Sequence, residues 1–215
     1  MIIRVKYKKG EEVKYVGHLD SMRTFTRCLK RTNIPVEYSK GFNPRIQISF
    51  ALPLGVGVTS DADYFDLTLE SKMNIDLFLS ELNSVLPLGF KVLEAKYIED
   101  KKSLMSLVKE AKYELTLKTN IEKEKIENLL NEEKLIIIKE GKNKKQNQEL
   151  DIKPYILDYT VGGDAHIDPH NIILKIHSTA GSVNNLNPLY LINIISEKLG
   201  EIEDYEIKRE ELILG

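Results

Sequence analysis

The sequence predicts an α+β protein built from two tandem ferredoxin-like domains, each with the element order βαββαβ. Segments that alternate apolar and polar residues, as half-buried strands do, are separated by segments with apolar residues every three or four positions, as in amphipathic helices. The same order of segments then occurs a second time within the 215 residues. We therefore expect an N-terminal domain over residues 1–100 and a C-terminal domain over residues 110–215.

The first half contains six expected elements and one pronounced turn. The elements are a strand at 2–8, a helix at 17–31, a strand at 46–50, a strand at 64–69, a helix at 75–86 and a strand at 90–97. The turn Gly41-Phe42-Asn43-Pro44 precedes the second strand and predicts a long, bent hairpin, because glycine and proline interrupt regular structure.

The second half repeats this order. The expected elements are a strand at 113–118, a helix at 122–130, a strand pair formed by 135–138 and 155–160, a strand at 172–176, a helix at 188–199 and a strand at 205–209. On this interpretation both domains share one plan and together account for the whole chain.

The composition is that of a water-soluble globular protein. Hydrophobic residues make up 42% of the chain and charged residues 30%, and no apolar run approaches the roughly 20 residues that span a bilayer. The chain begins with a strand-like pattern rather than a signal peptide, so we expect a cytoplasmic protein without a membrane partner. A single cysteine, Cys28, excludes an internal disulfide and a cluster site made of cysteines alone, and we expect no cofactor.

Positive charge is concentrated at the start of the chain. Residues 1–50 contain 11 lysines and arginines against 4 acidic residues, although the whole chain has a net charge of −2. A local basic excess is typical of surfaces that bind phosphate, nucleic acid or an acidic partner, and solvated charge is the simpler explanation.

Four cations follow one another along the first helix: Arg23, Arg27, Lys30 and Arg31. Their spacing predicts a positive ridge beside the apolar face, and acidic residues are nearly missing after Asp20. Because such a ridge lacks a counter-charge of its own, it favours a phosphate-rich ligand over an ordinary solvated helix face.

The turn after this helix combines cations with an aromatic ring and an amide. Its candidate binding residues are Lys40, Phe42, Asn43 and Arg45. These residue types can stack on a base while neutralising its phosphate. The alternative is a structural turn in which Phe42 packs inward, and the sequence leaves both interpretations open.

We expect no catalytic residue and no metal site. His18 could serve in acid–base chemistry, but a histidine at a helix start is more often a local hydrogen-bonding group. Cys28 has no base beside it and is expected to be buried. His166, His170 and His177 follow no metal-ligand spacing. The phosphate-loop, dinucleotide and esterase motifs are missing from the sequence.

Several short motifs resemble the radical-SAM-associated family of uncharacterised bacterial domains. The matching residues are Gly17-His18-Leu19-Asp20, Arg23, Phe25, Arg27, Gly41-Phe42-Asn43-Pro44-Arg45, Ser49-Phe50-Ala51, Pro53-Leu54-Gly55, Ser60, Tyr64 and Asp66. Members of that family occur alone or attached to radical-SAM enzymes with a cobalamin-binding region. The resemblance implies a non-catalytic accessory protein whose partner is a radical-SAM enzyme, with this chain binding an RNA substrate or holding the enzyme.

Two alternative functions remain. The tandem plan also resembles the CRISPR repeat-processing endoribonucleases, in which His18 would be the acid–base, helped by Tyr15 or Lys14, with Arg23 and Arg45 on the phosphate. Against this, the second half lacks the glycine-rich loop of those nucleases and is acidic at 199–204. The third class is a protein-only adaptor that docks through the acidic second half and the apolar segment 51–58.

Overall fold

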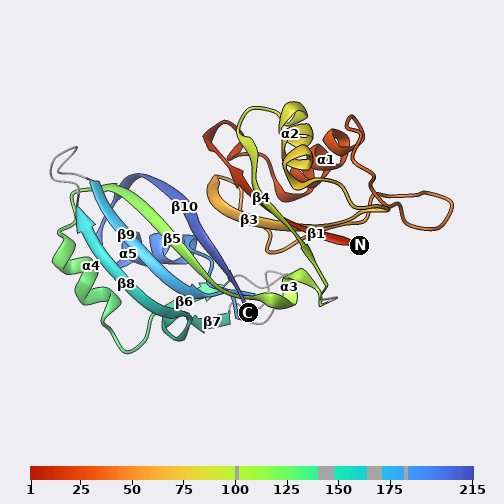
Figure 1. Ribbon diagram of the computed structural model, residues 1–215. Coiled ribbons are helices and arrows are strands. Elements are labelled where there is room, and N and C mark those ends of the chain that lie inside the picture. Colours follow the sequence, from red (N-terminus) through yellow and green to blue (C-terminus); the bar gives the residue numbers. More distant parts are fainter. Residues whose placement is uncertain (100–101, 140–147, 164–170, 182–183) are drawn as a thin grey trace. The chain divides into compact units, whose positions relative to one another are not determined.

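The computed structural model describes residues 1–99, 102–139, 148–163, 171–181 and 184–215 (Figure 1). The chain divides into two compact units. Unit 1 comprises Met1–Lys109 and Arg209–Gly215, and unit 2 comprises Glu110–Lys208. The expected division assigned the whole C-terminal part to the second domain, whereas residues 209–215 group with unit 1.

Unit 1 has the expected element order. Its elements are β1 (Ile2–Lys9), η1 (Glu11–Val13), α1 (His18–Leu29), β2 (Ile48–Phe50), β3 (Val58–Thr68), α2 (Ile75–Val85), β4 (Phe90–Ile98) and the short α3 (Leu104–Leu107). The strands lie in the order β4-β1-β3-β2, and each of these pairings is antiparallel. The strand β3 begins six residues before the expected start at Tyr64, so it is longer than its alternating pattern indicated.

Helices α1 and α2 cover one face of this sheet (Figure 1). Alternate residues of β1, namely Ile3, Val5 and Tyr7, are buried in the same core as Phe25 of α1. Phe25 is fully buried, and its ring lies 4.9 Å from that of Tyr7, with further aromatic neighbours on β2, β3 and β4. Edge and tilted ring contacts of this kind add to the free energy gained by burial.

The spacing of Leu19, Met22, Phe25 and Leu29 predicts the apolar face of α1, and the observed buried face differs from it. The helix buries Ser21, Phe25, Cys28 and Leu29, whereas Leu19 is 65% exposed. The helix is therefore rotated so that its N-terminal leucine lies outside the core. This rotation places Leu19 on the same side as the basic residues.

Unit 2 contains α4 (Lys123–Leu130), β6 (Ile136–Lys139), β7 (Gln148–Asp151), η2 (Lys153–Tyr155), β8 (Ile156–Gly163), β9 (Asn171–Thr179) and α5 (Leu189–Leu199). It also contains nearly all of β5 (Val108–Thr119) and the part of β10 (Ile202–Leu214) that precedes Arg209. Strand β9 pairs with both β5 and β8 in antiparallel fashion, and β10 lies beside β5. The sequence predicts a strand pair formed by 135–138 and 155–160, but β6 pairs with β7 in a separate two-stranded sheet. Strand β8, which overlaps the expected strand at 155–160, pairs with β9 instead.

The protein thus has a mixed fold of antiparallel strands with few helices. Among the described residues, no helix has the length and apolar character needed to cross a bilayer.

Candidate nucleic-acid interface

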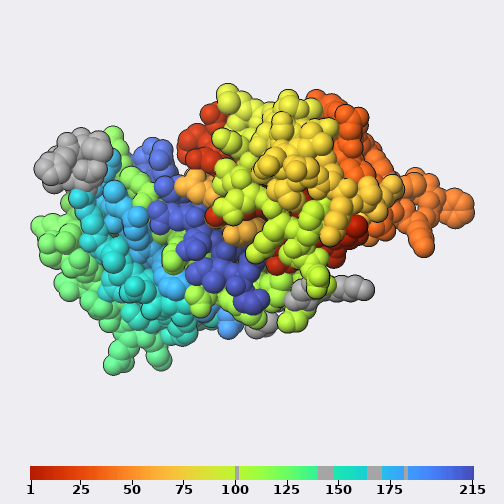
Figure 2. All heavy atoms as spheres, in the orientation of Figure 1, coloured from red at the N-terminus to blue at the C-terminus, as the bar shows by residue number. Residues whose placement is uncertain are grey.

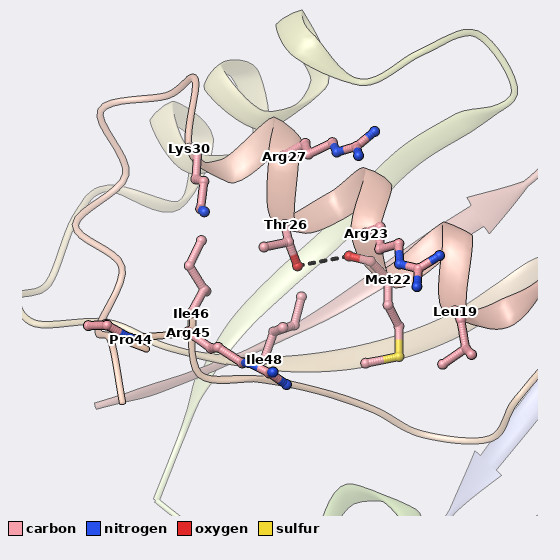
Figure 3. A pocket seen from close by; sticks show the side chains of 10 residues that line it. All are labelled: Leu19, Met22, Arg23, Thr26, Arg27, Lys30, Pro44, Arg45, Ile46 and Ile48. Atoms are coloured by element: carbon pink, nitrogen blue, oxygen red, sulfur yellow. Dashed lines mark hydrogen bonds between the residues drawn. The ribbon is translucent and has the colours of Figure 1, made fainter. Parts of the chain in front are cut away.

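A groove lies between α1 and the segment that leads into β2 (Figure 3). Its volume is about 650 Å³. The lining residues are Leu19, Met22, Arg23, Thr26, Arg27, Lys30, Pro44, Arg45, Ile46 and Ile48. Four of these ten side chains are cationic and none is acidic. The groove therefore combines an apolar floor with a positive rim.

The cations approach the groove from two segments of the chain. Arg23 and Arg27 are exposed on α1, Lys30 is exposed at the C-cap of this helix, and Arg45 is exposed on the opposite wall. Lys30 extends from the helix toward Ile46, whereas Arg27 points away from the floor (Figure 3). Arg23 forms an exposed ion pair with Asp20 at 2.8 Å. Within the described part of the chain, Arg27, Lys30 and Arg45 have no ion pair with a carboxylate.

Arg31 does not line this groove. Successive residues of an α-helix are rotated by about 100°, so adjacent residues point in different directions. Arg31 Nη2 donates to the carbonyl oxygen of Val85 at 2.7 Å and to Cys28 Sγ at 3.2 Å. It lines a second hollow of about 520 Å³ together with Arg27 and the end of α2. Arg31 thus connects α1 to α2 through these contacts.

The remaining predicted binding residues lie on a hairpin that projects from unit 1 (orange in Figures 1 and 2). Ser39 N–H donates to the carbonyl oxygen of Arg45 at 2.8 Å, and Arg45 N–H donates to Ser39 Oγ at 3.0 Å, which closes the loop. Phe42 at its apex is fully exposed, so the inward-packed alternative is wrong. Lys40 and Asn43 are also exposed, and neither lines the groove.

His18 is the first residue of α1, is partly buried and does not line the groove. Its ring meets Phe50 edge-on at 5.8 Å. Burial lowers its pKa below the usual 6.5, the Asp63 carboxylate opposes this shift, and Lys9 adds to it. Lys14, the helper of the nuclease hypothesis, is instead paired with Glu11 at 2.7 Å and lies over the Tyr15 ring.

Unit 1 contains a buried polar cluster that is not predicted from the sequence. The guanidinium of Arg209 donates to the carboxylate of Asp63 and to the carbonyl oxygen of Leu52 at 3.1 Å. Nearby, Lys9 Nζ donates to the carbonyl oxygens of Lys14 and Val16 at 3.0 and 2.8 Å. Asp63 is in phase with the buried Phe65, so a longer strand prediction would have placed it in the core.

The described residues contain no group of three histidines, cysteines or carboxylates that could hold a metal ion. His166 and His170 lie outside the described residues. His177 Nε2 lies 2.6 Å from Glu110 Oε2, on adjacent strands β9 and β5. Cys28 is buried, as expected, and its Sγ lies 3.3 Å from the carbonyl oxygen of Val85.

A family described as "Uncharacterized protein conserved in bacteria (DUF2344)" matches residues 3–188. The comparison with curated proteins found no match.

Solved structures that this chain resembles include the following three. The structure described as "Crystal Structure of a Cbf5-Nop10-Gar1 Complex" gives 12% identity and a TM-score of 0.52, covering 98% of this chain and 48% of that one. The "archaeal box H/ACA sRNP Nop10-Cbf5 complex" gives 14% identity, a TM-score of 0.47 and coverage of 97% and 46%. An "Unknown Protein from Galdieria sulphuraria" gives 15% identity and a TM-score of 0.27, with 97% of each chain covered. This chain spans about half the length of the first two, and only the first likeness supports a shared fold.

Proposed function

The chain belongs to the family described as "Uncharacterized protein conserved in bacteria (DUF2344)", and we propose that it is an accessory protein that binds RNA through the groove beside α1. One observation carries the proposal. Cations from two separate segments, Lys30 and Arg45 among them, meet around a groove that has no acidic lining residue. Phosphates of a nucleic acid backbone are the natural counter-charge for such a rim.

An ordinary solvated surface explains this arrangement less well. Two other lysines of unit 1 have carboxylate partners: Lys8 pairs with Asp61 at 2.9 Å and Lys14 with Glu11 at 2.7 Å. Lys30 and Arg45 have no such partner among the described residues, although the chain as a whole carries more acidic than basic residues. Positive side chains that lie close together without a carboxylate partner favour the binding of an anionic ligand.

We further propose that unit 1 is a ferredoxin-like domain. The strand order β4-β1-β3-β2, with α1 and α2 on one face, is the arrangement expected for a βαββαβ domain. In unit 2, the order β8-β9-β5-β10 agrees with a second copy that carries the β6–β7 hairpin as an insertion.

The proposed partner is a radical-SAM enzyme. This part of the proposal rests on the resemblance of the motifs in residues 17–66. The only cysteine of this chain is the buried Cys28, so the partner would supply the cysteines that hold the iron–sulfur cluster. In the proposal, this chain presents RNA to that enzyme. Co-purification of a tagged chain from its source cell, with mass spectrometry of the captured proteins, tests the assignment. Capture of proteins that contain no radical-SAM enzyme would contradict it.

The RNA part is tested with labelled total small RNA from the source cell. We expect the wild type to retain RNA and to leave it intact, and we expect Lys30→Ala/Arg45→Ala to lose most of the binding. The matched control is Lys91→Ala/Lys96→Ala, which removes two exposed lysines of β4 that do not line the groove. Equal losses in the two double variants would contradict the groove as the binding site.

The same experiment tests the nuclease alternative. Cleavage of the RNA that His18→Ala abolishes would replace the accessory function by an endoribonuclease. Absence of RNA binding at every salt concentration would contradict the proposal and favour the protein-only adaptor.

A further inference from the structure

We infer that the groove and the projecting hairpin take unpaired nucleotides, with one base on the apolar floor and a neighbouring base stacked on Phe42. This inference rests on the proposed RNA binding and names the kind of RNA that the site accepts. A duplex contacts proteins mainly through its phosphates and sugars, whereas splayed bases of single strands need apolar surfaces and rings.

The floor of the groove provides such an apolar surface. Met22 descends from α1, and Ile46 and Ile48 rise from the opposite segment (Figure 3). The volume of about 650 Å³ lies within the range of pockets that enclose small organic ligands. A site that only attracted phosphates would gain nothing from these aliphatic side chains, but the face of a base can pack on them.

The rim positions the backbone of the same nucleotide. Lys30 stands on one wall and Arg45 on the other, so an occupant of the groove has a cation on each side. Arg23 is held at 2.8 Å by Asp20, and Arg27 points away from the floor (Figure 3), which leaves Lys30 and Arg45 as the principal phosphate contacts. Thr26 Oγ1 donates to the carbonyl oxygen of Met22 at 2.8 Å and is therefore already engaged in the helix.

Phe42 extends the site beyond the groove. It is fully exposed at the apex of the loop that Ser39 and Arg45 close. Pro44, a lining residue, is two positions away, so its Cα lies within about 7 Å of the Cα of Phe42. Gly41 has a φ of 133° and no atom within 4 Å of the position of a Cβ, so the loop turns sharply and nothing crowds it. The ring is therefore presented where a base next to the bound nucleotide can stack.

The test compares one 12-nucleotide RNA without self-complementarity, the same strand annealed to its complement, and single-stranded DNA of the same sequence. Fluorescence anisotropy should show tighter binding of the single-stranded RNA than of the duplex. Phe42→Ala should weaken single-strand binding about 5- to 150-fold, which is the loss expected for one stacked base, and should leave duplex binding unchanged. Phe42→Tyr, which keeps a ring, should restore it.

The control variant is Leu88→Ala, which removes an apolar side chain of similar exposure on the loop before β4. If single-stranded DNA binds as tightly as single-stranded RNA, the result supports this site, because the site then recognises bases and phosphates and not the 2′-hydroxyl. Duplex binding as tight as single-strand binding, or a Phe42→Ala effect no larger than that of Leu88→Ala, would overturn this inference while RNA binding itself stood. Failure to bind any of the three nucleic acids, with binding of a poly-glutamate peptide, would overturn the proposed function as well.

Discussion

Arg209 on β10 and Asp63 on β3 form an ion pair inside unit 1, although they lie 146 positions apart in the chain. Both side chains are almost completely buried, at 1% and 3% exposure. Residue Arg209 is also the first of the C-terminal residues that group with unit 1. The pair therefore ties the end of the chain to the core that supports α1.

Breaking this pair should destabilise the protein strongly. Arg209→Ala leaves the Asp63 carboxylate buried without its partner, and we expect a loss of about 3–5 kcal/mol in the free energy of unfolding. Urea denaturation measures this loss. The control is Lys8→Ala, which breaks a half-exposed ion pair between β1 and β3 and should cost less than about 1 kcal/mol.

Replacing both partners by apolar residues distinguishes the cost of an unpaired buried charge from the cost of lost packing. Asp63→Leu/Arg209→Met should be less destabilising than either single change, because no charge is then left unpaired. An Arg209→Ala loss as small as that of Lys8→Ala would contradict the structural role of the pair.

Gly89, just before β4, should tolerate no side chain. Its φ is 94°, and a Cβ built there would lie 2.8 Å from Val13 Cγ2. Gly89→Ala should cost at least about 1–2 kcal/mol from the backbone conformation alone, and displacement of Val13 adds to this. The control is Gly55→Ala, because a Cβ at Gly55 would lie 3.4 Å from Val58 Cγ2, an ordinary contact distance. This change should alter the free energy of unfolding by less than about 1 kcal/mol. Equal thermal stability of the two variants would contradict the described turn.

Stability should fall on acidification in a way that depends on His18. Burial holds the pKa of His18 below 6.5 in the folded protein, so the unfolded chain binds the proton more readily. The stabilisation of the folded protein by neutral His18 is therefore fully present above pH 6.5. It is lost as the pH falls through the lower pKa that His18 has in the folded protein. Urea unfolding between pH 7.5 and pH 5 should show a smaller loss in His18→Gln than in wild type. Parallel pH profiles for the two proteins would contradict a lowered pKa.

Local patterns predict much of the fold. Alternation and helical spacing give the βαββαβ order of unit 1 and the basic ridge of α1, because both depend on residues close in sequence. The bent hairpin around Gly41 and Pro44 also follows from turn chemistry. From these segments Arg23, Arg27, Lys30 and Arg45 could be named, and the structure brings them to one groove.

Other features depend on tertiary packing and could not be predicted in this way. The rotation of α1 exposes Leu19 and buries Ser21, against the preference of both residues. Arg31 was grouped with Lys30 by proximity in sequence, although the rotation of about 100° per residue separates the two side chains. The partner of Asp63 lies at the other end of the chain, and no local pattern links it to Arg209.

The central claim is that Lys30 and Arg45 bind phosphates in the groove, and the salt dependence of RNA binding tests it most directly. For single-stranded RNA, the logarithm of the binding constant falls with the logarithm of salt concentration, with a slope of about −0.7 per phosphate contact. Lys30→Ala/Arg45→Ala should make the slope shallower by about 1.4, since two contacts are lost. Lys91→Ala/Lys96→Ala should follow the wild type. A groove variant that keeps the wild-type slope would contradict the account.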